Sequence, residues 1–182
     1  KLDTRNTTYV IAVVDDEQFL GHVYYGKKLK EVHLDGLLRI HENPFVPSRN
    51  NRDRVSFLDS FPMEYPAHGL GDYRESCINI RTEKGNVGLA LSYVSHKITE
   101  GKDGLEGLPA SFGEAGECET LKILCEDKVT GLQVILQYGI FDEADVITRS
   151  VKVVNTGKED LYLTKVYSAC LDMDNKDFEK NS

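Results

Sequence analysis

The chain has 182 residues, with 22 Lys and Arg against 30 Asp and Glu, and a formal net charge of -8 at pH 7. This acidic balance argues against a nucleic-acid or anionic-membrane partner, because both need clustered basic side chains. With 40% hydrophobic and 29% charged residues, and no run of 18 apolar residues, the composition indicates one globular domain and no membrane-spanning segment.

The hydrophobic periodicity is that of β-structure. Eight segments rich in Val, Ile, Leu, Tyr and Thr are predicted to be strands: 8–14, 19–25, 77–81, 87–98, 119–125, 132–140, 146–154 and 161–171. Turn residues such as Glu83-Lys-Gly-Asn86 and Asn155-Thr-Gly-Lys158 separate them. Residues 32–38 fit either a short helix or a further strand. Many strands at this spacing predict an all-β fold, a large antiparallel β-sandwich.

The segment from Asp59 to Arg74 is the most informative part of the chain. Pro62 and Pro66 lack an N–H group, while Gly69 and Gly71 permit positive φ, so the segment is predicted to be a shaped loop. Ordered loops of this length are usually functional or lie at an interface.

The same segment carries a family resemblance. Glu64-Tyr-Pro66 followed by Gly71-Asp-Tyr-Arg74 resembles a signature of the N-terminal domain of the α-galactosidases of glycoside hydrolase family 36. Further short motifs match in the same order and spacing, namely His22-Val-Tyr-Tyr-Gly26, Phe45-Val-Pro47, Phe57-Leu-Asp59, Gly107-Leu-Pro109, Arg149-Ser150 and Ser168-Ala-Cys-Leu-Asp172.

The resemblance implies a two-sheet supersandwich of the galactose-mutarotase type over residues 1–174. Residues 175–182 would then begin the linker to a catalytic (β/α)₈ barrel that this chain does not contain. It also implies that the parent protein is a cytoplasmic, cofactor-free, retaining α-galactosidase acting on melibiose- or raffinose-type sugars. Retaining hydrolysis needs two carboxyl groups about 5–5.5 Å apart, and the family places them in the barrel. No catalytic residue is therefore expected in this chain, and the fragment alone should be inactive.

The loop supplies five candidate interface residues. Asp72 and Arg74 lie at i and i+2, so they would face the same side if a strand began near Asp72. The pair could then hold the loop or bind sugar hydroxyls. Glu64, Tyr65 and Tyr73 are assigned to the loop and to an interface, because aromatic residues near prolines more often fill a core or an interface than stack on a sugar.

Glu42 and Asn43 are the candidate substrate contacts. In family tetramers a loop of this domain reaches the active-site mouth of a neighbouring subunit, and the resemblance places its acidic residue at Glu42. Family members carry Asp at that point, so the longer Glu side chain is a departure. The alternative is a solvated loop.

Two other functions remain open at this stage. One is a stand-alone carbohydrate-binding module, and the other is a mutarotase-like enzyme, which would need His68 or His96 to converge with a glutamate in a cleft.

No metal site is predicted. The four cysteines, at 77, 118, 125 and 170, form no C-x-x-C pair, and no acidic cluster has the pattern of a calcium loop. The cysteines are expected to be reduced thiols, mostly buried.

Overall fold

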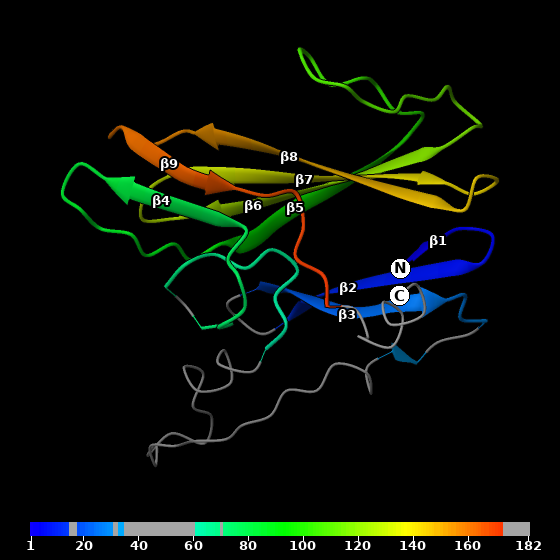
Figure 1. The fold of residues 1–182 in the computed structure, drawn as a ribbon, viewed down its shortest axis with the longest axis horizontal. Helices are drawn as coiled ribbons and strands as arrows, with labels where there is room; N and C mark the ends of the chain where they lie inside the picture. Colours follow the sequence, from blue (N-terminus) through cyan, green and yellow to red (C-terminus); the bar gives the residue numbers. More distant parts are fainter. Residues whose placement is uncertain (15–17, 31–32, 35–60, 70, 173–182) are drawn as a thin grey trace, which may run out of the picture.

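The chain folds into antiparallel β-sheets (Figure 1). The computed structural model describes residues 1–14, 18–30, 33–34, 61–69 and 71–172. Within these ranges there is no α-helix. The strands are β1 (Leu2–Asp3), β2 (Thr7–Val14), β3 (Phe19–Lys27), β4 (Ile78–Thr82), β5 (Ser92–Glu100), β6 (Glu119–Asp127), β7 (Leu132–Phe141), β8 (Val146–Asn155) and β9 (Leu161–Val166).

One layer is a four-stranded sheet in the order β5-β6-β7-β8. Its side chains alternate between faces, as in any pleated strand. On β7, Leu132, Val134, Leu136 and Tyr138 are each at most 1% exposed, while the residues between them are partly exposed. This alternation is the one visible in the sequence, and it sets the buried face of the sheet.

The second layer is assembled from two smaller sheets, β1-β2-β3 and β4-β9. The segment 61–67 joins them, because its backbone bonds to both neighbours. The N–H of His22 donates to the Pro62 carbonyl at 2.7 Å, and the N–H of Cys77 donates to the Pro66 carbonyl at 2.8 Å. The predicted loop is thus an extended segment between β3 and β4 (Figure 1).

The core lies between the two layers. Tyr9 and Leu20 of one small sheet and Ile78 and Ile80 of the other pack in one cluster with the buried face of β6 and β7. A smaller cluster, formed by Val14, Phe19, Phe61 and Met63, holds the start of segment 61–67 on β2 and β3. Gly21 is required there, since a Cβ atom at this position would lie 2.6 Å from the Phe61 ring. The predicted antiparallel sandwich is confirmed.

Two strand ends differ from the sequence prediction by several residues, and one short strand is additional. The strand expected from Val87 begins only at Ser92, because the preceding backbone bonds elsewhere: Leu89 N–H donates to the His68 carbonyl, and Ala90 N–H donates to the Asp127 carboxylate at 2.6 Å. The last strand ends at Val166 rather than at Leu171, and the two-residue β1 was not predicted. The alternatives for residues 32–38 fall almost wholly outside the described residues.

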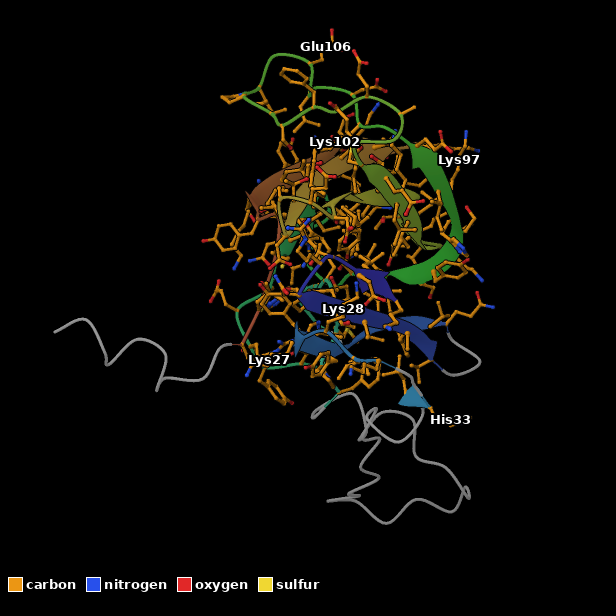
Figure 2. All side chains as sticks on the ribbon, turned by 90° about the vertical axis from the view of Figure 1, so that its right-hand side faces the viewer. Lys27, Lys28, His33, Lys97, Lys102 and Glu106 are labelled. Carbon is orange, nitrogen blue, oxygen red and sulfur yellow. The ribbon has the colours of Figure 1, made fainter. Side chains whose placement is uncertain are left out.

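The loop between β5 and β6 extends away from the sandwich. Figure 2 shows Lys102 at its base and Glu106 near its outer end. Lys102 is 7% exposed, and its ammonium group donates to the carbonyl of Ser111. A Cβ atom on Gly139 would lie 2.5 Å from the Lys102 side chain, so that glycine makes room for the lysine. The base of the loop is therefore fixed to β7.

Candidate functional site

A buried carboxylate, Glu64, lies between the two layers. Its side chain is fully buried, and Oε1 accepts hydrogen bonds from Tyr138 Oη at 2.6 Å and Tyr9 Oη at 2.8 Å. Arg149 Nη1 lies 3.0 Å from the same oxygen, and His22 Nδ1 lies 3.2 Å from Oε2. We call these five residues the Glu64 cluster.

The Glu64 cluster connects four strands to segment 61–67. Tyr9 lies on β2, His22 on β3, Tyr138 on β7 and Arg149 on β8. Pro62 and Pro66 flank Glu64 and favour extended backbone on either side of it. The Glu64 N–H donates to the Leu20 carbonyl at 2.9 Å, which fixes this residue beside β3 and turns its side chain inward.

The electrostatics of the cluster follow from its burial. Burial, and then the adjacent Glu64 carboxylate, raises the pKa of Tyr138 well above its ordinary value, and the pKa of Tyr9 rises for the same two causes. Both phenols therefore stay protonated and donate to the carboxylate. Desolvation opposes the charge on Arg149, but the acidic groups around it, including the Glu64 carboxylate, have the larger effect, so the pKa of Arg149 is raised.

The Arg149 guanidinium also lies over the aromatic ring of Tyr138. Its guanidinium carbon lies 5.0 Å from the Tyr138 ring centroid, a cation–π distance. Among the described residues, its Nη2 is the buried side-chain nitrogen without a hydrogen-bond partner. The cation is therefore paired with Glu64 but incompletely bonded, which makes the pair sensitive to the loss of either member.

This arrangement does not suit glycoside hydrolysis. Hydrolysis with retention needs two carboxyl groups on either side of an accessible bond. Glu64 is a single carboxylate with 0% exposure, and its oxygens are occupied by donors from both layers. Its chemical role is to cross-link the two sheets.

The second charged cluster is centred on Asp72 and Arg74. Arg74 donates to both carboxylate oxygens of Asp72, from Nε at 2.8 Å and from Nη2 at 2.7 Å. The same Nη2 donates to the Met63 carbonyl at 2.8 Å, and Asp72 accepts from the Met63 N–H at 3.1 Å. Nη1 reaches Asp172 at 3.0 Å. Hydrogen bonding to Asp72 is the main reason that the pKa of Arg74 is raised.

Asp72 and Arg74 bond to each other and to the backbone of Met63, but not through the strand geometry that the sequence suggested. No strand begins near Asp72, since β4 starts at Ile78. Asp72 instead has a φ of 47°, in the left-handed region that Asp tolerates better than most residues. A tight turn, rather than strand alternation, brings the two side chains together.

The structure separates the predicted interface residues. Glu64 and Tyr65 lie inside the sandwich, at 0% and 5% exposure, and the Tyr65 hydroxyl donates to the Tyr167 carbonyl at 2.9 Å. Tyr73 is 85% exposed and lines a pocket of about 500 Å³ together with Asp72, Arg74 and Lys165. Only Tyr73 among these aromatics is therefore presented to solvent. The candidate substrate contacts Glu42 and Asn43 lie outside the described residues.

His68 and His96, either of which a mutarotase-like site would pair with a glutamate, line two different pockets. His68 lines the pocket beside Tyr73, which Glu75 also lines. His96 lies on β5, where its Nδ1 is 2.7 Å from the Tyr93 hydroxyl, and it lines a different pocket between β2 and β5. Among the described residues, His22 lies within hydrogen-bond distance of a glutamate, Glu64; the sequence analysis placed His22 in a family motif and not among the candidate site residues.

In the part of the chain that the structure describes, no group of three or more His, Cys, Asp or Glu side chains is arranged to hold a metal ion. The four cysteines are free, and Cys77, Cys118 and Cys125 are buried. Burial raises the pKa of Cys77 and of Cys125 to about 12, so these thiols stay neutral. The part of the chain that the structure describes contains no helix long and apolar enough to cross a membrane.

The fold and the two clusters define an all-β scaffold whose charged groups cross-link sheets and hold a loop. Residues 18–181 match the Glycosyl hydrolase family 36 N-terminal domain. The chain belongs to glycoside hydrolase family 36, as its N-terminal domain.

The similar proteins are α-galactosidases. The chain is 39% identical over 180 residues to the bifunctional α-galactosidase/sucrose kinase of Mediterraneibacter gnavus, a match that covers 98% of this chain and 19% of that protein. It is 36% identical over 162 residues to an α-galactosidase of Geobacillus stearothermophilus, which covers 88% of this chain and 22% of the relative. The chain thus spans about a fifth of the length of these relatives.

Solved structures give the same result. The galactosidase domain of the α-galactosidase–sucrose kinase superimposes with a TM-score of 0.84 at 40% identity, over 93% of this chain and 24% of that one. The G. stearothermophilus α-galactosidase in complex with raffinose superimposes with a TM-score of 0.82 at 36% identity, over 92% of this chain and 23% of that one.

Proposed function

We propose that the chain is the N-terminal β-sandwich domain of a retaining α-galactosidase that removes terminal α-galactose from melibiose- or raffinose-type sugars. The observation that carries the proposal is the match to α-galactosidases over 98% of the chain. The chemistry would belong to a (β/α)₈ barrel elsewhere in the parent protein, with residues 1–174 forming this domain and 175–182 beginning the linker.

The domain would act as a scaffold. The Glu64 cluster supports this role, because the buried Glu64 carboxylate bonds to side chains from strands of both layers. The Asp72–Arg74 pair supports it too, since both side chains hold a loop whose exposed Tyr73 is available for a contact with another part of the protein.

The remaining roles are part of the same proposal. The domain would support the barrel, contribute to a homo-oligomer, by family resemblance a tetramer, and present Glu42 and Asn43 at the rim of a neighbouring active site. The parent enzyme would be cytoplasmic and would need no cofactor.

The test is the release of nitrophenol from a nitrophenyl α-galactoside. The parent protein should turn over the substrate, and the purified 182-residue chain should not, because the family resemblance assigns both catalytic carboxylates to a barrel that is not part of these 182 residues. Turnover by the 182-residue chain that a substitution within it abolishes would contradict the proposal, as would a parent protein that cleaves no α-galactoside.

A carbohydrate-binding module is the second candidate, favoured by one observation. Tyr73 is 85% exposed at the edge of a polar pocket of about 500 Å³, which is a geometry suited to stacking on a sugar ring. Calorimetric titration of the 182-residue chain with melibiose or raffinose distinguishes the two. Binding that the Tyr73→Ala variant loses would favour the module.

A further inference from the structure

The loop between β5 and β6 contains an aspartate that is followed directly by a glycine. Asp103 and Gly104 come between Lys102, at the base of this loop, and Glu106, near its outer end (Figure 2). Among the described residues, no other aspartate or asparagine precedes a glycine. The pair matters chemically, because the backbone nitrogen that follows an aspartate can attack the side-chain carboxyl carbon. Glycine obstructs this approach least, since it has no Cβ atom.

The carboxyl group of Asp103 is free to meet that nitrogen. Its side chain is exposed, and within the described part of the chain nothing forms a hydrogen bond or ion pair with its carboxylate. Two other carboxylates are held in place. Asp127 accepts from backbone N–H groups of its own turn, and Asp145 accepts from Thr4 and Asn6. Asp103 lacks such a restraint.

The backbone of Gly104 is equally unrestrained. The residue is exposed and lies outside the strands, and its N–H group bonds to none of the described residues. A Cβ atom at this position would meet no atom within 4 Å. Rotation that brings the Gly104 nitrogen onto the Asp103 carboxyl carbon therefore breaks no hydrogen bond of either group, so it costs little free energy.

We propose that Asp103 is a site of spontaneous covalent modification, at which aspartate converts to isoaspartate through a cyclic succinimide. The Gly104 nitrogen forms a bond to the protonated carboxyl carbon, Cγ, and the Cγ–OH bond breaks, so that water leaves with the amide hydrogen. Water then adds to one of the two ring carbonyl carbons and breaks its bond to the nitrogen. Opening at Cγ restores aspartate, and opening at the main-chain carbonyl carbon gives isoaspartate. The mass is unchanged, and no oxidant or reductant takes part.

Lys102 should direct the ring opening toward isoaspartate. Its side chain is 7% exposed, and its ammonium group donates to the Ser111 carbonyl and lies 3.5 Å from the Asp103 carbonyl oxygen. Within the described ranges, no carboxylate forms an ion pair with it. Opening at the main-chain carbon turns the Asp103 carbonyl into a carboxylate. The buried ammonium then gains a counter-ion, and a charge-assisted bond is stronger than a bond to a neutral carbonyl.

The modification would change the protruding loop without reaching the core. In isoaspartate the main chain runs through Cγ, which adds one methylene group at the start of the loop. The two ends of the loop are held together, because Lys102 and Gly113 exchange backbone hydrogen bonds of 2.8 and 3.1 Å. The residues between them must shift to accommodate the longer chain. They include the motif Gly107-Leu-Pro109, whose Leu108 is 65% exposed. This proposal is independent of the proposed function.

Peptide mapping of the stored 182-residue chain tests the proposal. Isoaspartyl and aspartyl peptides have equal mass and separate by chromatography, and fragmentation locates the altered residue. Isoaspartate at position 103 should accumulate at about the rate seen in a synthetic peptide of residues 100–107, because the loop gives the pair no hydrogen-bond protection. Asp127 and Asp145 should stay unmodified. The second Asp-Gly pair of the sequence, Asp35-Gly36, lies outside the described residues and falls in a different tryptic peptide.

Two outcomes of the map would overturn the proposal. One is a chain that keeps aspartate at position 103 while the synthetic peptide isomerises, since the fold would then protect the pair. The other is equal isomerisation at Asp127 and Asp145, since the reaction would then come from unfolded chains.

Two variants test the route. Gly104→Ala should slow the reaction severalfold, because a Cβ atom hinders the attacking nitrogen. Its fold should be kept, since the position is open and its φ lies outside the left-handed region. Asp103→Glu keeps the charge but would need a larger ring, so it should give no detectable product. An unchanged rate in Gly104→Ala would exclude attack by this amide.

The product ratio tests the part played by Lys102. The isoaspartyl share of the product should be larger in the folded chain than in the synthetic peptide, where no buried ammonium faces the carbonyl. An equal share in the two would show that Lys102 does not direct the ring opening.

Discussion

The hydroxyl of Tyr138 on β7 donates a 2.6 Å hydrogen bond to the carboxylate of Glu64, 74 residues earlier in the chain. This bond crosses the interior from the four-stranded sheet to segment 61–67, which lies in the opposite layer. Arg149 and Tyr9 meet the same carboxylate oxygen, so the two layers share one buried anion. The first two predictions concern this anion.

Tyr138→Phe should lower the free energy of unfolding by about 1–3 kcal/mol, because it leaves a buried carboxylate short of one donor while keeping the ring. Urea denaturation of the purified chain measures the change. Tyr162→Phe is the control, at a ring that is 48% exposed, and should cost no more than about 0.5 kcal/mol. Equal midpoints for Tyr138→Phe and wild type would show that the bond does not brace the layers.

Glu64→Gln should destabilise the domain more strongly, by about 3–5 kcal/mol, because Arg149 would remain buried without its counter-ion. A double-mutant cycle with Arg149→Met measures the coupling. The double variant should lose less stability than the sum of the two single losses, since neither charge is then left alone. Strict additivity would show that the two side chains act independently.

The sequence predicted the sheets better than the cluster. The alternation of Val134, Leu136 and Tyr138 identified β7 and its buried face, because strand periodicity is a local property. The contacts of Glu64 are not local: its partners on β2 and β8 are 55 and 85 positions away. The two prolines that shape its segment were visible, but the register that brings Tyr9 and Arg149 to it was not.

The start of β5 was predicted wrongly for a related reason. Leu89 and Ala90 have the composition of a strand, yet their N–H groups bond to the His68 carbonyl and the Asp127 carboxylate instead of to a neighbouring strand. Such bonds depend on tertiary contacts. The Asp72–Arg74 pair lay within reach of sequence reasoning because its members are two residues apart.

Arg74→Ala should lower the free energy of unfolding by about 1–3 kcal/mol, since it strands the buried Asp72 carboxylate and frees the Met63 carbonyl. Arg74→Lys should recover only part of the loss, because lysine cannot bond both carboxylate oxygens in a planar fork. Arg81→Ala, which removes an exposed cation–π contact, is the control and should cost at most about 1 kcal/mol. An unchanged denaturation midpoint for Arg74→Ala, together with lost activity in the parent enzyme, would assign Arg74 to the substrate instead.

Asp145 should make stability depend on pH in the acid range. Its carboxylate accepts from Thr4 Oγ1 at 2.5 Å and from the Asn6 N–H at 3.0 Å, and these bonds lower its pKa from 3.8 to about 2. The folded state therefore binds this proton less readily than the unfolded state. The contribution to stability is fully present above pH 3.8 and is lost as the pH falls toward 2.

The comparison of wild type with Asp145→Asn measures this contribution. Asn tolerates the φ of 55° at this turn position, so the backbone should be preserved. The stability difference between the two proteins should shrink steadily as the pH is lowered from 5 to 2. A difference that is independent of pH would exclude the carboxylate as its source.

The last prediction concerns Glu42, which lies outside the described residues and is assigned to a neighbouring active site by family resemblance. A carboxylate at the mouth of a sugar pocket would accept hydrogen bonds from galactose hydroxyls, and charge-assisted bonds of this kind contribute about 1.5–3 kcal/mol. In the parent enzyme, Glu42→Ala should therefore raise KM or lower kcat/KM by about tenfold or more, with little loss of stability. The same substitution in the 182-residue chain should change nothing measurable.

Subunit mixing tests whether Glu42 reaches a neighbouring active site. Subunits with an inactivated barrel and subunits carrying Glu42→Ala should recover activity when mixed, because some mixed oligomers pair an intact barrel with an intact Glu42. If subunits exchange without recovery and the single variant is fully active, Glu42 is a solvated loop residue.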